Sequence, residues 1–321
     1  MWTPDICIYH HPCTDGFTAA WAVWKRFGDV VEYVPANYGD APPDVAGKNV
    51  LIVDFSYKRP VLEAMAESAR TIVVLDHHET AEKELTGFNR VSGYVDGIHH
   101  LLERAAGPAR NVLVAFDMAL SGAMLAWIFC HQAKTPPRLV CYVEDRDLWK
   151  FALPFSREIS AYLSSRRRFF DTWDEIAAEM ERSRGFHNYH VAGAAVLHAR
   201  ELEIESGIDH AMRMMVIGGF TVPVANLPRT WSSEAGNILA EGNRFAATYY
   251  DGPKGRAFSL RSSADGLNVA EIAAMYGGGG HAHAAGFLMP LGWLVIGSAI
   301  TGLAAAPPRG NRGPGRSHSE P

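Results

Sequence analysis

The chain has 321 residues, which at roughly 150 residues per domain predicts about two domains. Hydrophobic residues make up 48% of it and charged residues 20%, which excludes disorder along the whole length. A formal net charge of -5 argues against a protein that holds long duplex DNA by overall charge. Four cysteines without framework spacing argue against a disulfide-stapled secreted protein, so we expect a soluble, cytoplasmic protein.

The sequence contains no segment that predicts secretion or membrane insertion. Its first residues lack the basic region and the long apolar region of a signal peptide. The apolar run at residues 291–306 has 16 residues, fewer than the roughly 18 to 20 needed to cross a bilayer. We therefore expect no contact with a membrane, and we interpret residues 291–321 as a partly disordered C-terminal extension, because much of it is Pro, Gly and Arg.

Apolar runs of strand length alternate with helix-like segments in the first half of the chain. The strands expected are Ile6–Tyr9, Val30–Val34, Val50–Phe55 and Thr71–Leu75, and the helices are Phe17–Phe27, Pro60–Arg70 and Leu120–Gln132. Buried strands joined by helices are typical of a parallel sheet that is covered on both faces. Ser121 is a candidate N-cap of the last helix, with Asp117 as the alternative.

The second half begins with a mostly helical stretch over residues 156–206, after which the pattern changes. The later strands expected are Met212–Ile217, Phe220–Leu227, Ala246–Tyr250 and Ala257–Arg261, with helices at Ser233–Gly242 and Val269–Tyr276. The sequence therefore predicts an α/β fold with a parallel-sheet domain over residues 1–185. A helical linker over residues 186–206 would join it to a smaller α/β domain over residues 207–290.

Acids and histidines recur just beyond the C-terminal ends of the predicted strands. They are His10, His11, Cys13 and Asp15 after the first strand, Asp54 and Ser56 after the third, and Asp76, His77 and His78 after the fourth. Ligands bind at this edge of open α/β sheets. Taken singly, each residue has a structural explanation, such as a turn at Asp15 or a helix cap at Asp54. Together they predict one site.

Carboxylates and imidazoles gathered in one place are typical of a site for divalent metals. Carboxylates favour Mn²⁺ or Mg²⁺, and a mixture with imidazole suits manganese, iron, cobalt or zinc. Two metals about 4 Å apart need a bridging carboxylate and at least six ligands. Enough candidates are present: one of His10 or His11, with Asp15, Asp54, Asp76, His77, His78 and Asp145.

Five motifs in order along the chain resemble those of the DHH phosphoesterase superfamily. LDHHE at Leu75–Glu79 resembles the defining Asp-His-His motif, and GGGGHAHAAGF at Gly277–Phe287 resembles the signature of the associated DHHA1 domain. The other three are YHHPCTDGFTAAW at Tyr9–Trp21, LIVDFS at Leu51–Ser56 and VEDRDLWKF at Val143–Phe151. The resemblance extends from about Asp5 to Pro290, nearly the whole chain.

The superfamily includes exonucleases of the RecJ type, nanoRNases, cyclic-dinucleotide phosphodiesterases, exopolyphosphatases and manganese pyrophosphatases. The resemblance implies a phosphohydrolase with two Mn²⁺ ions in the cleft between its domains, with Mg²⁺, Co²⁺, Zn²⁺ or Fe²⁺ as alternatives. It implies that Asp54 bridges the metals, that His10 and Cys13 bind one of them, and that Asp15, His77 and Asp145 bind the other. Asp76 would orient His77, and His78 would face the phosphate. Arg261, Gly278, Gly279, Gly280 and His281 would bind the terminal phosphate or the nucleotide.

Two features depart from the family pattern. Many relatives carry Asp-x-Asp in the first motif, whereas this chain has Cys13, whose softer thiolate favours zinc or iron. Cys13 could alternatively be a nucleophile with His10 or His11 as its base. The pairs His10/His11 and Asp145/Asp147 also leave the ligand open, and Asp145 is our preference.

We expect hydrolysis of phosphodiester bonds in short single-stranded oligonucleotides or other small phosphate compounds. One alternative is an exopolyphosphatase-like hydrolase of phosphoanhydrides. An alternative of another class is a nucleotide- or metal-binding module with little turnover. Arg166, Arg167 and Arg168 could steer a phosphate-rich substrate, although such runs more often form a solvated helix face.

Overall fold

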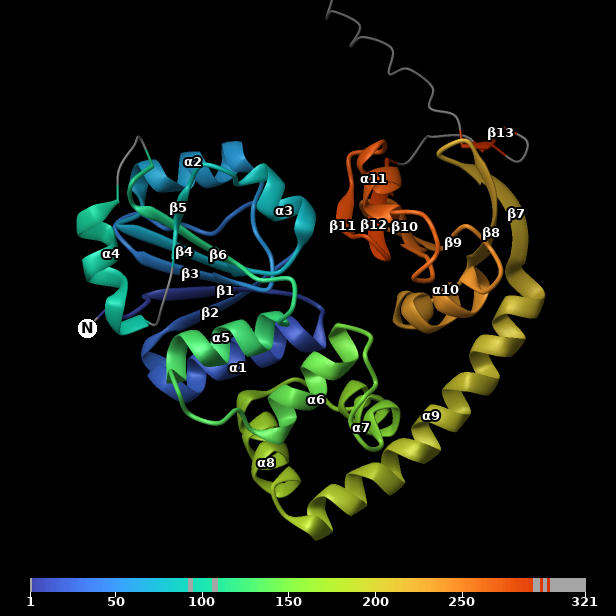
Figure 1. The fold of residues 1–321 in the computed structure, drawn as a ribbon, viewed down its shortest axis with the longest axis horizontal. Helices are drawn as coiled ribbons and strands as arrows, with labels where there is room; N and C mark the ends of the chain where they lie inside the picture. Colours follow the sequence, from blue (N-terminus) through green and yellow to red (C-terminus); the bar gives the residue numbers. More distant parts are fainter. Residues whose placement is uncertain (1, 92–94, 106–108, 291–294, 297–298, 301–321) are drawn as a thin grey trace, which may run out of the picture.

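The computed structural model describes residues 2–91, 95–105, 109–290, 295–296 and 299–300. Its two sheets belong to different parts of the chain, and one long helix leads from the first part to the second (Figure 1). None of the described helices is both long enough and apolar enough to cross a membrane. The predicted disorder within residues 291–321 lies largely outside the described residues.

Within the described residues, six parallel strands form the first sheet, in the order β2-β1-β3-β4-β6-β5. They are β1 (Ile6–His10), β2 (Glu32–Ala36), β3 (Asn49–Val53), β4 (Thr71–Asp76), β5 (Asn89–Arg90) and β6 (Val112–Phe116). From β1 the chain passes to β2 on one side and then to β3 and β4 on the other. The strand order therefore reverses between β1 and β3, and such a switch point is where open α/β sheets bind ligands.

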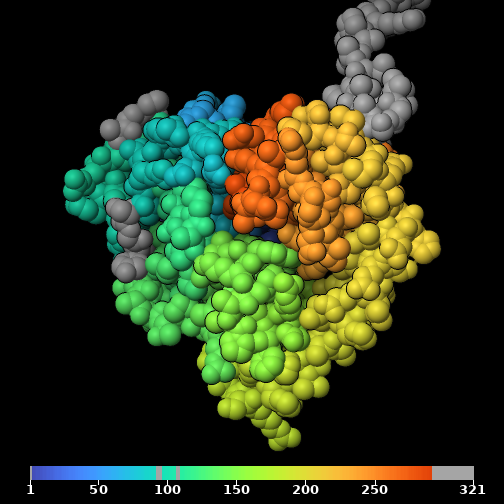
Figure 2. All heavy atoms as spheres, turned by 45° about the vertical axis from the view of Figure 1, so that its right-hand side comes forward, coloured from blue at the N-terminus to red at the C-terminus, as the bar shows by residue number. Residues whose placement is uncertain are grey.

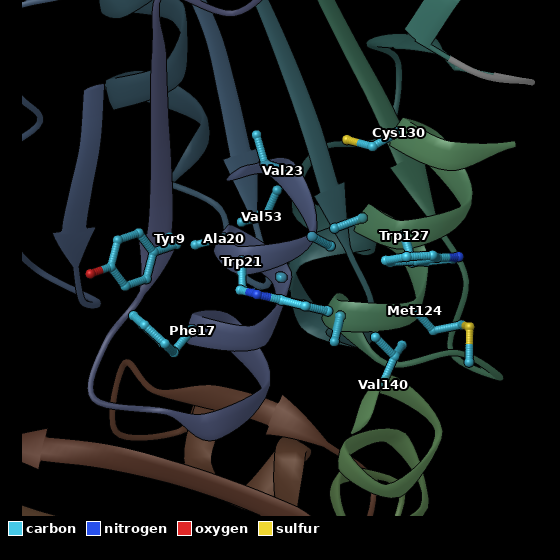
Figure 3. Close-up of a cluster of buried hydrophobic side chains, with 14 of the residues drawn as sticks. Tyr9, Phe17, Ala20, Trp21, Val23, Val53, Met124, Trp127, Cys130 and Val140 are labelled. Carbon is cyan, nitrogen blue, oxygen red and sulfur yellow. The ribbon is translucent and has the colours of Figure 1, made fainter. Parts of the chain in front are cut away.

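Helices cover both faces of this sheet. They are α1 (Thr14–Phe27), η1 (Gly28–Val30), α2 (Arg59–Ser68), α3 (Glu79–Glu84), η2 (Val95–Gly97), α4 (Ile98–Arg104), α5 (Gly122–His131) and α6 (Arg138–Asp147). On one face Trp21 of α1 stacks on Trp127 of α5, with 6.1 Å between ring centroids (Figure 3). On the other face Leu62 and Met65 of α2 belong to the core that contains Ile52 of β3. Burial on both faces explains why these strands are continuously apolar.

The α/β fold predicted from the sequence is confirmed. The predicted strands and helices of the first half lie within three residues of the observed ones, but α3, α4, β5, β6 and α6 were not predicted. Ser121 is the N-cap of α5, because its hydroxyl accepts the Met124 N–H at 3.3 Å. Asp117 instead accepts the Ala119 N–H in the preceding turn, at 2.9 Å.

Three helices follow: α7 (Ser156–Ser164), α8 (Phe170–Met180) and α9 (Ser183–Ala211). The segment 186–206, predicted as a linker, lies entirely inside α9. Gly193 lets α9 pack closely on α7, since a Cβ there would lie 1.9 Å from the Glu158 carbonyl oxygen. We call residues 2–182 the first lobe and residues 212–290 the second lobe.

The second sheet, over the described residues, has the strand order β11-β12-β10-β9-β8-β7-β14-β13. Its strands are β7 (Met212–Ile217), β8 (Phe220–Asn226), β9 (Ala246–Gly252), β10 (Gly255–Arg261), β11 (Gly279–His281), β12 (Ala284–Met289), β13 (Val295–Ile296) and β14 (Ala299–Ile300). Its helices are η3 (Arg229–Trp231), α10 (Ser232–Ala240) and α11 (Val269–Ala274). The β7–β8 pair turns at Gly218 and Gly219, as predicted, and both glycines have positive φ. Phe245, Phe258 and Phe287 lie in the core of this lobe.

Candidate metal centre

Asp54 lies directly after β3, at the switch point of the first sheet. Its backbone has φ of 64°, a left-handed conformation that is uncommon outside glycine, and its side chain is buried. One carboxylate oxygen, Oδ1, is 3.1 Å from Nε2 of His77, which follows β4. The other, Oδ2, is 3.3 Å from Nδ1 of His10, at the end of β1. The two oxygens of Asp54 thus contact imidazoles that come from different strands.

Two glycines make room for this carboxylate. A Cβ on Gly122, at the start of α5, would lie 2.5 Å from the Cβ of Asp54. A Cβ on Gly16, in α1, would lie 2.3 Å from the His10 carbonyl oxygen and 2.9 Å from Asp54 Oδ2. No side chain fits at either position without moving Asp54 or His10. Gly16 lies with Asp15 in the first turn of α1, and its missing side chain lets this helix pack directly against the site.

Two groups of metal-binding side chains meet at Asp54. His10, Cys13 and Asp54 form one group, and in it the possible ligand atoms lie within 4.8 Å of one another. Asp15, His77 and Asp147 form the other group under the same limit, with His77 Nε2 at 3.7 Å from Asp15 Oδ2 and 3.5 Å from Asp147 Oδ2. The structure therefore brings together every predicted ligand except Asp145, and it includes His10 rather than His11.

Burial and like charges disfavour the charged forms of the carboxylates in the second group. The Asp15 carboxylate accepts the N–H groups of Gly122 at 2.6 Å and Ala123 at 3.0 Å, at the N-terminus of α5. Even so, burial raises the pKa of Asp15 well above its usual value, and the negative charges of Asp54 and Asp147 raise it further. Burial also raises the pKa of Asp147, and the neighbouring Asp54 adds to that effect.

The histidines partly compensate this charge. Burial alone would lower the pKa of His77, but its hydrogen bond to Asp54 and the charge of Asp147 raise that pKa to about 11. Burial likewise opposes the charged form of Asp54, yet hydrogen bonds from His10 and His77 keep the pKa of its carboxyl well below the usual range. A bound cation would therefore stabilise the charged forms of the carboxylates in both ligand groups.

Asp76 orients His78, and this corrects the expectation that it orients His77. Its Oδ1 lies 2.7 Å from His78 Nδ1, whereas it contacts His77 only through the backbone N–H, at 2.8 Å. The turn after β4 directs the His77 ring toward Asp54 and leaves the His78 ring beside Asp76. Asp76 Oδ2 and His77 Nδ1 are buried atoms without a hydrogen-bond partner among the described residues.

Asp145 is not part of the cluster, and Asp147 takes its place. The chain turns back after α6, so that Asp145 Oδ1 accepts the Ala152 N–H at 2.9 Å and Asp145 Oδ2 accepts the Leu153 N–H at 3.2 Å. Residues two apart on a helix point to different sides, which directs Asp147 toward His77. Asp145 therefore fixes the turn that follows α6.

The second lobe reaches the site through His281. Its ring stacks on His78 with 4.6 Å between centroids and lies 4.9 Å from His77. These histidines form a further group of possible ligand atoms within 4.8 Å of one another. Burial lowers the pKa of His281 to about 2, with further lowering by His78 and His77, so this imidazole is neutral at ordinary pH.

Residues 277–280 lead directly into His281, but fewer of their backbone N–H groups are left to bind phosphate than the sequence predicts. The Gly278 N–H donates to the Ala273 carbonyl at 3.0 Å, and the Gly280 N–H donates to Thr80 Oγ1 of α3 at 3.1 Å. Both amides are thus already bonded in this arrangement of the lobes. A Cβ on Gly279 would lie 2.8 Å from Thr80 Oγ1, so the missing side chain allows β11 to rest on α3. Figure 2 shows this part of the second lobe against the first.

Arg261 ends β10 and donates to Ser233 Oγ at 2.8 Å. Burial lowers the pKa of Arg261 to about 10, and the charge of Arg146 adds to this effect. Its own charge in turn helps to lower the pKa of His281, so the two side chains lie within electrostatic reach of each other.

Sequence reasoning missed Tyr38. This residue follows β2, and its ring centroid lies 5.4 Å from that of His10 and 6.0 Å from that of His78. About half of Tyr38 (49%) is exposed, so an aromatic surface is accessible beside the cluster. The rule that polar residues gather at strand ends applies equally to the second strand and could have identified it.

No family model matches the chain. An uncharacterized protein of Acanthamoeba polyphaga mimivirus is 26% identical over 305 residues, which cover 88% of this chain and 66% of that protein. A pGpG-specific phosphodiesterase from Vibrio cholerae is similar at a TM-score of 0.37 and 14% identity, over 89% of this chain and 93% of its own. An exopolyphosphatase-related protein from Bacteroides fragilis is similar at a TM-score of 0.41 and 13% identity, over 88% of this chain and 86% of its own. TM-scores below 0.5 assign neither a residue role nor an activity to this chain.

Proposed function

We propose that this chain is a DHH-type metal-dependent phosphohydrolase that cleaves phosphodiester bonds of short oligonucleotides or nucleotides. One observation carries the proposal: Asp54 contacts His10 with one oxygen and His77 with the other. A carboxylate with one oxygen in each of two ligand groups is the arrangement that a pair of divalent cations needs.

The residues present fit two such cations. His10, Cys13 and Asp54 would hold one, and Asp15, His77 and Asp147 the other. Asp54 would also serve the second cation, because its Oδ1 lies beside His77. Their oxygen and nitrogen donors suit manganese, iron, cobalt or zinc. The raised pKa values of the buried Asp15 and the half-buried Asp147 support the same conclusion, because these carboxylates lack enough positive charge around them. Divalent cations held there acidify water and offset the charge of a phosphate.

The chain itself orients the imidazole that would act on the phosphate. With Nδ1 of His78 held by Asp76, Nε2 is left to contact a phosphate oxygen or the leaving group. His281 packs on the face of the His78 ring and restricts its rotation. Arg261 contributes a half-buried positive charge on the side of the second lobe.

Tyr38 favours a nucleotide substrate over a purely inorganic one. Its exposed ring lies next to His10 and His78, at the distance where a nucleobase attached to a bound phosphate could stack. Stacking of a base on an aromatic side chain contributes about 1–3 kcal/mol. Inorganic polyphosphate has no group that could use this surface.

The test is an assay of purified protein with Mn²⁺ on a short RNA, a cyclic dinucleotide, polyphosphate and bis(p-nitrophenyl) phosphate. We expect turnover of the short RNA, and loss of turnover in Asp54→Asn. Asp209→Asn, an exposed change on α9, is the matched control and keeps the wild-type rate. Cleavage of polyphosphate alone would support the phosphoanhydride hydrolase instead. Metal binding without turnover of any substrate would support the binding module.

A further inference from the structure

Two arginines from different lobes converge on the loop that joins β1 to α1. Arg168, between α7 and α8, donates from Nη2 to Thr14 Oγ1 at 3.1 Å. Arg229, in η3 of the second lobe, donates from Nη2 to the Pro12 carbonyl oxygen at 3.0 Å. Pro12 and Thr14 are the residues on either side of Cys13, so the two guanidinium groups flank that member of the His10 group.

These two positive charges lie within electrostatic reach of each other. Among the described residues, neither Arg168 nor Arg229 has a carboxylate within 4 Å. Burial lowers the pKa of Arg168, and the charge of Arg229 contributes to that lowering. The two guanidinium groups therefore repel each other unless an anion lies between them.

One N–H group of Arg168 has no hydrogen-bond acceptor in the described part of the protein. Its Nε is buried and has no hydrogen-bond partner among the described residues. Arg166 and Arg167 are exposed, so only the last arginine of this run turns toward the site. The helix α1 begins at Thr14 without a side-chain cap, and its N-terminal partial positive charge adds to the same location.

We propose that Arg168 and Arg229 form a subsite for a second phosphate group of the substrate, next to the one that is cleaved. This proposal rests on the proposed function and narrows its substrate class. Guanidinium groups match the geometry of phosphate oxygens and stay charged at every physiological pH. The subsite selects substrates with at least two phosphates, such as a 5′-phosphorylated dinucleotide or a short polyphosphate, over a single phosphodiester. Because one arginine comes from each lobe, such a substrate also bridges the lobes.

The first experiment measures binding without catalysis. Inorganic phosphate is titrated into the metal-free full-length protein, where the carboxylates of the metal centre repel it. We expect binding that weakens with salt, and about tenfold weaker binding in Arg168→Gln and in Arg229→Gln. Arg167→Gln, in the same run but exposed, keeps the wild-type affinity. Absence of phosphate binding by the wild type, or equal loss in Arg167→Gln, overturns the subsite. Arg229 is exposed, so its substitution reports on the subsite even where Arg168→Gln affects folding.

The second experiment compares substrates in the presence of Mn²⁺. For a 5′-phosphorylated dinucleotide, Arg229→Gln raises KM about tenfold, whereas kcat/KM for bis(p-nitrophenyl) phosphate stays within twofold of wild type. Tripolyphosphate in parallel distinguishes a nucleotide source of the second phosphate from an inorganic one. An equal effect on single- and two-phosphate substrates contradicts the subsite. Absence of wild-type turnover on every substrate contradicts the proposed function, and the phosphate titration then still decides the subsite.

Discussion

The Cβ position of Gly122 lies 2.5 Å from the Cβ of Asp54, far inside the distance of normal carbon contact. The same glycine donates its N–H to Asp15 at 2.6 Å. One residue at the start of α5 thus leaves space for one carboxylate and binds another. The position of Asp54 between the two ligand groups depends on this contact.

Gly122→Ala is therefore expected to disturb the centre while the fold survives. Alanine is favourable in a helix, so the loss comes from displacement of Asp54 rather than from weakening of α5. We expect kcat/KM and Mn²⁺ affinity to fall at least about tenfold, as measured by steady-state kinetics and metal titration. Gly252→Ala is the control, since a Cβ there meets only ordinary contacts, the nearest at 3.6 Å. Wild-type kinetics in Gly122→Ala would show that Asp54 needs no such space.

Substitutions of Asp145 and Asp147 should have different effects: the first should lower stability and the second should lower metal affinity. Asp147→Asn removes a carboxylate of the Asp15 group, and we expect metal affinity to fall by more than the roughly 10- to 100-fold that loss of a ligand's partner causes. Asp145→Asn weakens two hydrogen bonds to backbone amides, each worth about 1–3 kcal/mol when charged, so we expect a lower Tm with metal affinity nearly unchanged. Thermal unfolding and metal titration of both variants check this. The opposite pattern would restore Asp145 as the ligand.

The strand pattern predicted much of the fold because buried parallel strands are continuously apolar. The strand-end rule also placed Asp54, His77 and His10 near each other. The strand-end rule could not decide whether Asp145 or Asp147 is the metal ligand, because both lie on the same helix, α6. That choice depends on the turn after α6, where Trp149 and Phe151 have positive φ, an uncommon conformation for aromatic residues.

Distant contacts were equally invisible in the sequence. The pairing of Arg229 with the Pro12 carbonyl joins residues 217 positions apart, and no local pattern encodes it. For the same reason Arg168 resembled its exposed neighbours in a basic run. The glycine run was recognised, but its amides were expected to bind phosphate, whereas Gly280 donates to Thr80, 200 positions away.

Metal binding should release protons and strengthen as pH rises. Without metal, His77 has a pKa raised to about 11, and the pKa of His10 is also raised well above its usual value, so both rings carry an extra proton at neutral pH. An imidazole nitrogen must lose that proton to bind a metal, so a higher pH favours binding. Calorimetric titration with Mn²⁺ in two buffers of different ionisation enthalpy measures the release, and titration at pH 6 and pH 8 measures the affinity. Equal affinity at both pH values would contradict this assignment of the ligands.

Cys13 should act as a metal ligand rather than as a nucleophile. Cys13→Asp replaces a soft donor by a hard one, so we expect turnover to persist and the ratio of the Mn²⁺-supported to the Zn²⁺-supported rate to rise. A thiol nucleophile predicts instead that all turnover disappears in this variant. Cys141→Ser, at a half-buried thiol outside the three candidate ligand groups, controls for general effects of cysteine loss. Rates with each metal, measured side by side, distinguish these outcomes.

The contacts between the lobes are largely polar and range from part-buried to exposed. Besides Thr80 with Gly280, they include the ion pairs of Arg146 with Glu234 at 2.9 Å and of Lys254 with Asp40. Exposed ion pairs contribute only about 0–1 kcal/mol each and are weakened by salt. The 29 residues of α9, about 43 Å of helix, join the lobes covalently. Higher ionic strength should therefore ease separation of the lobes at β11, and in the proposed hydrolase this would speed release of the product.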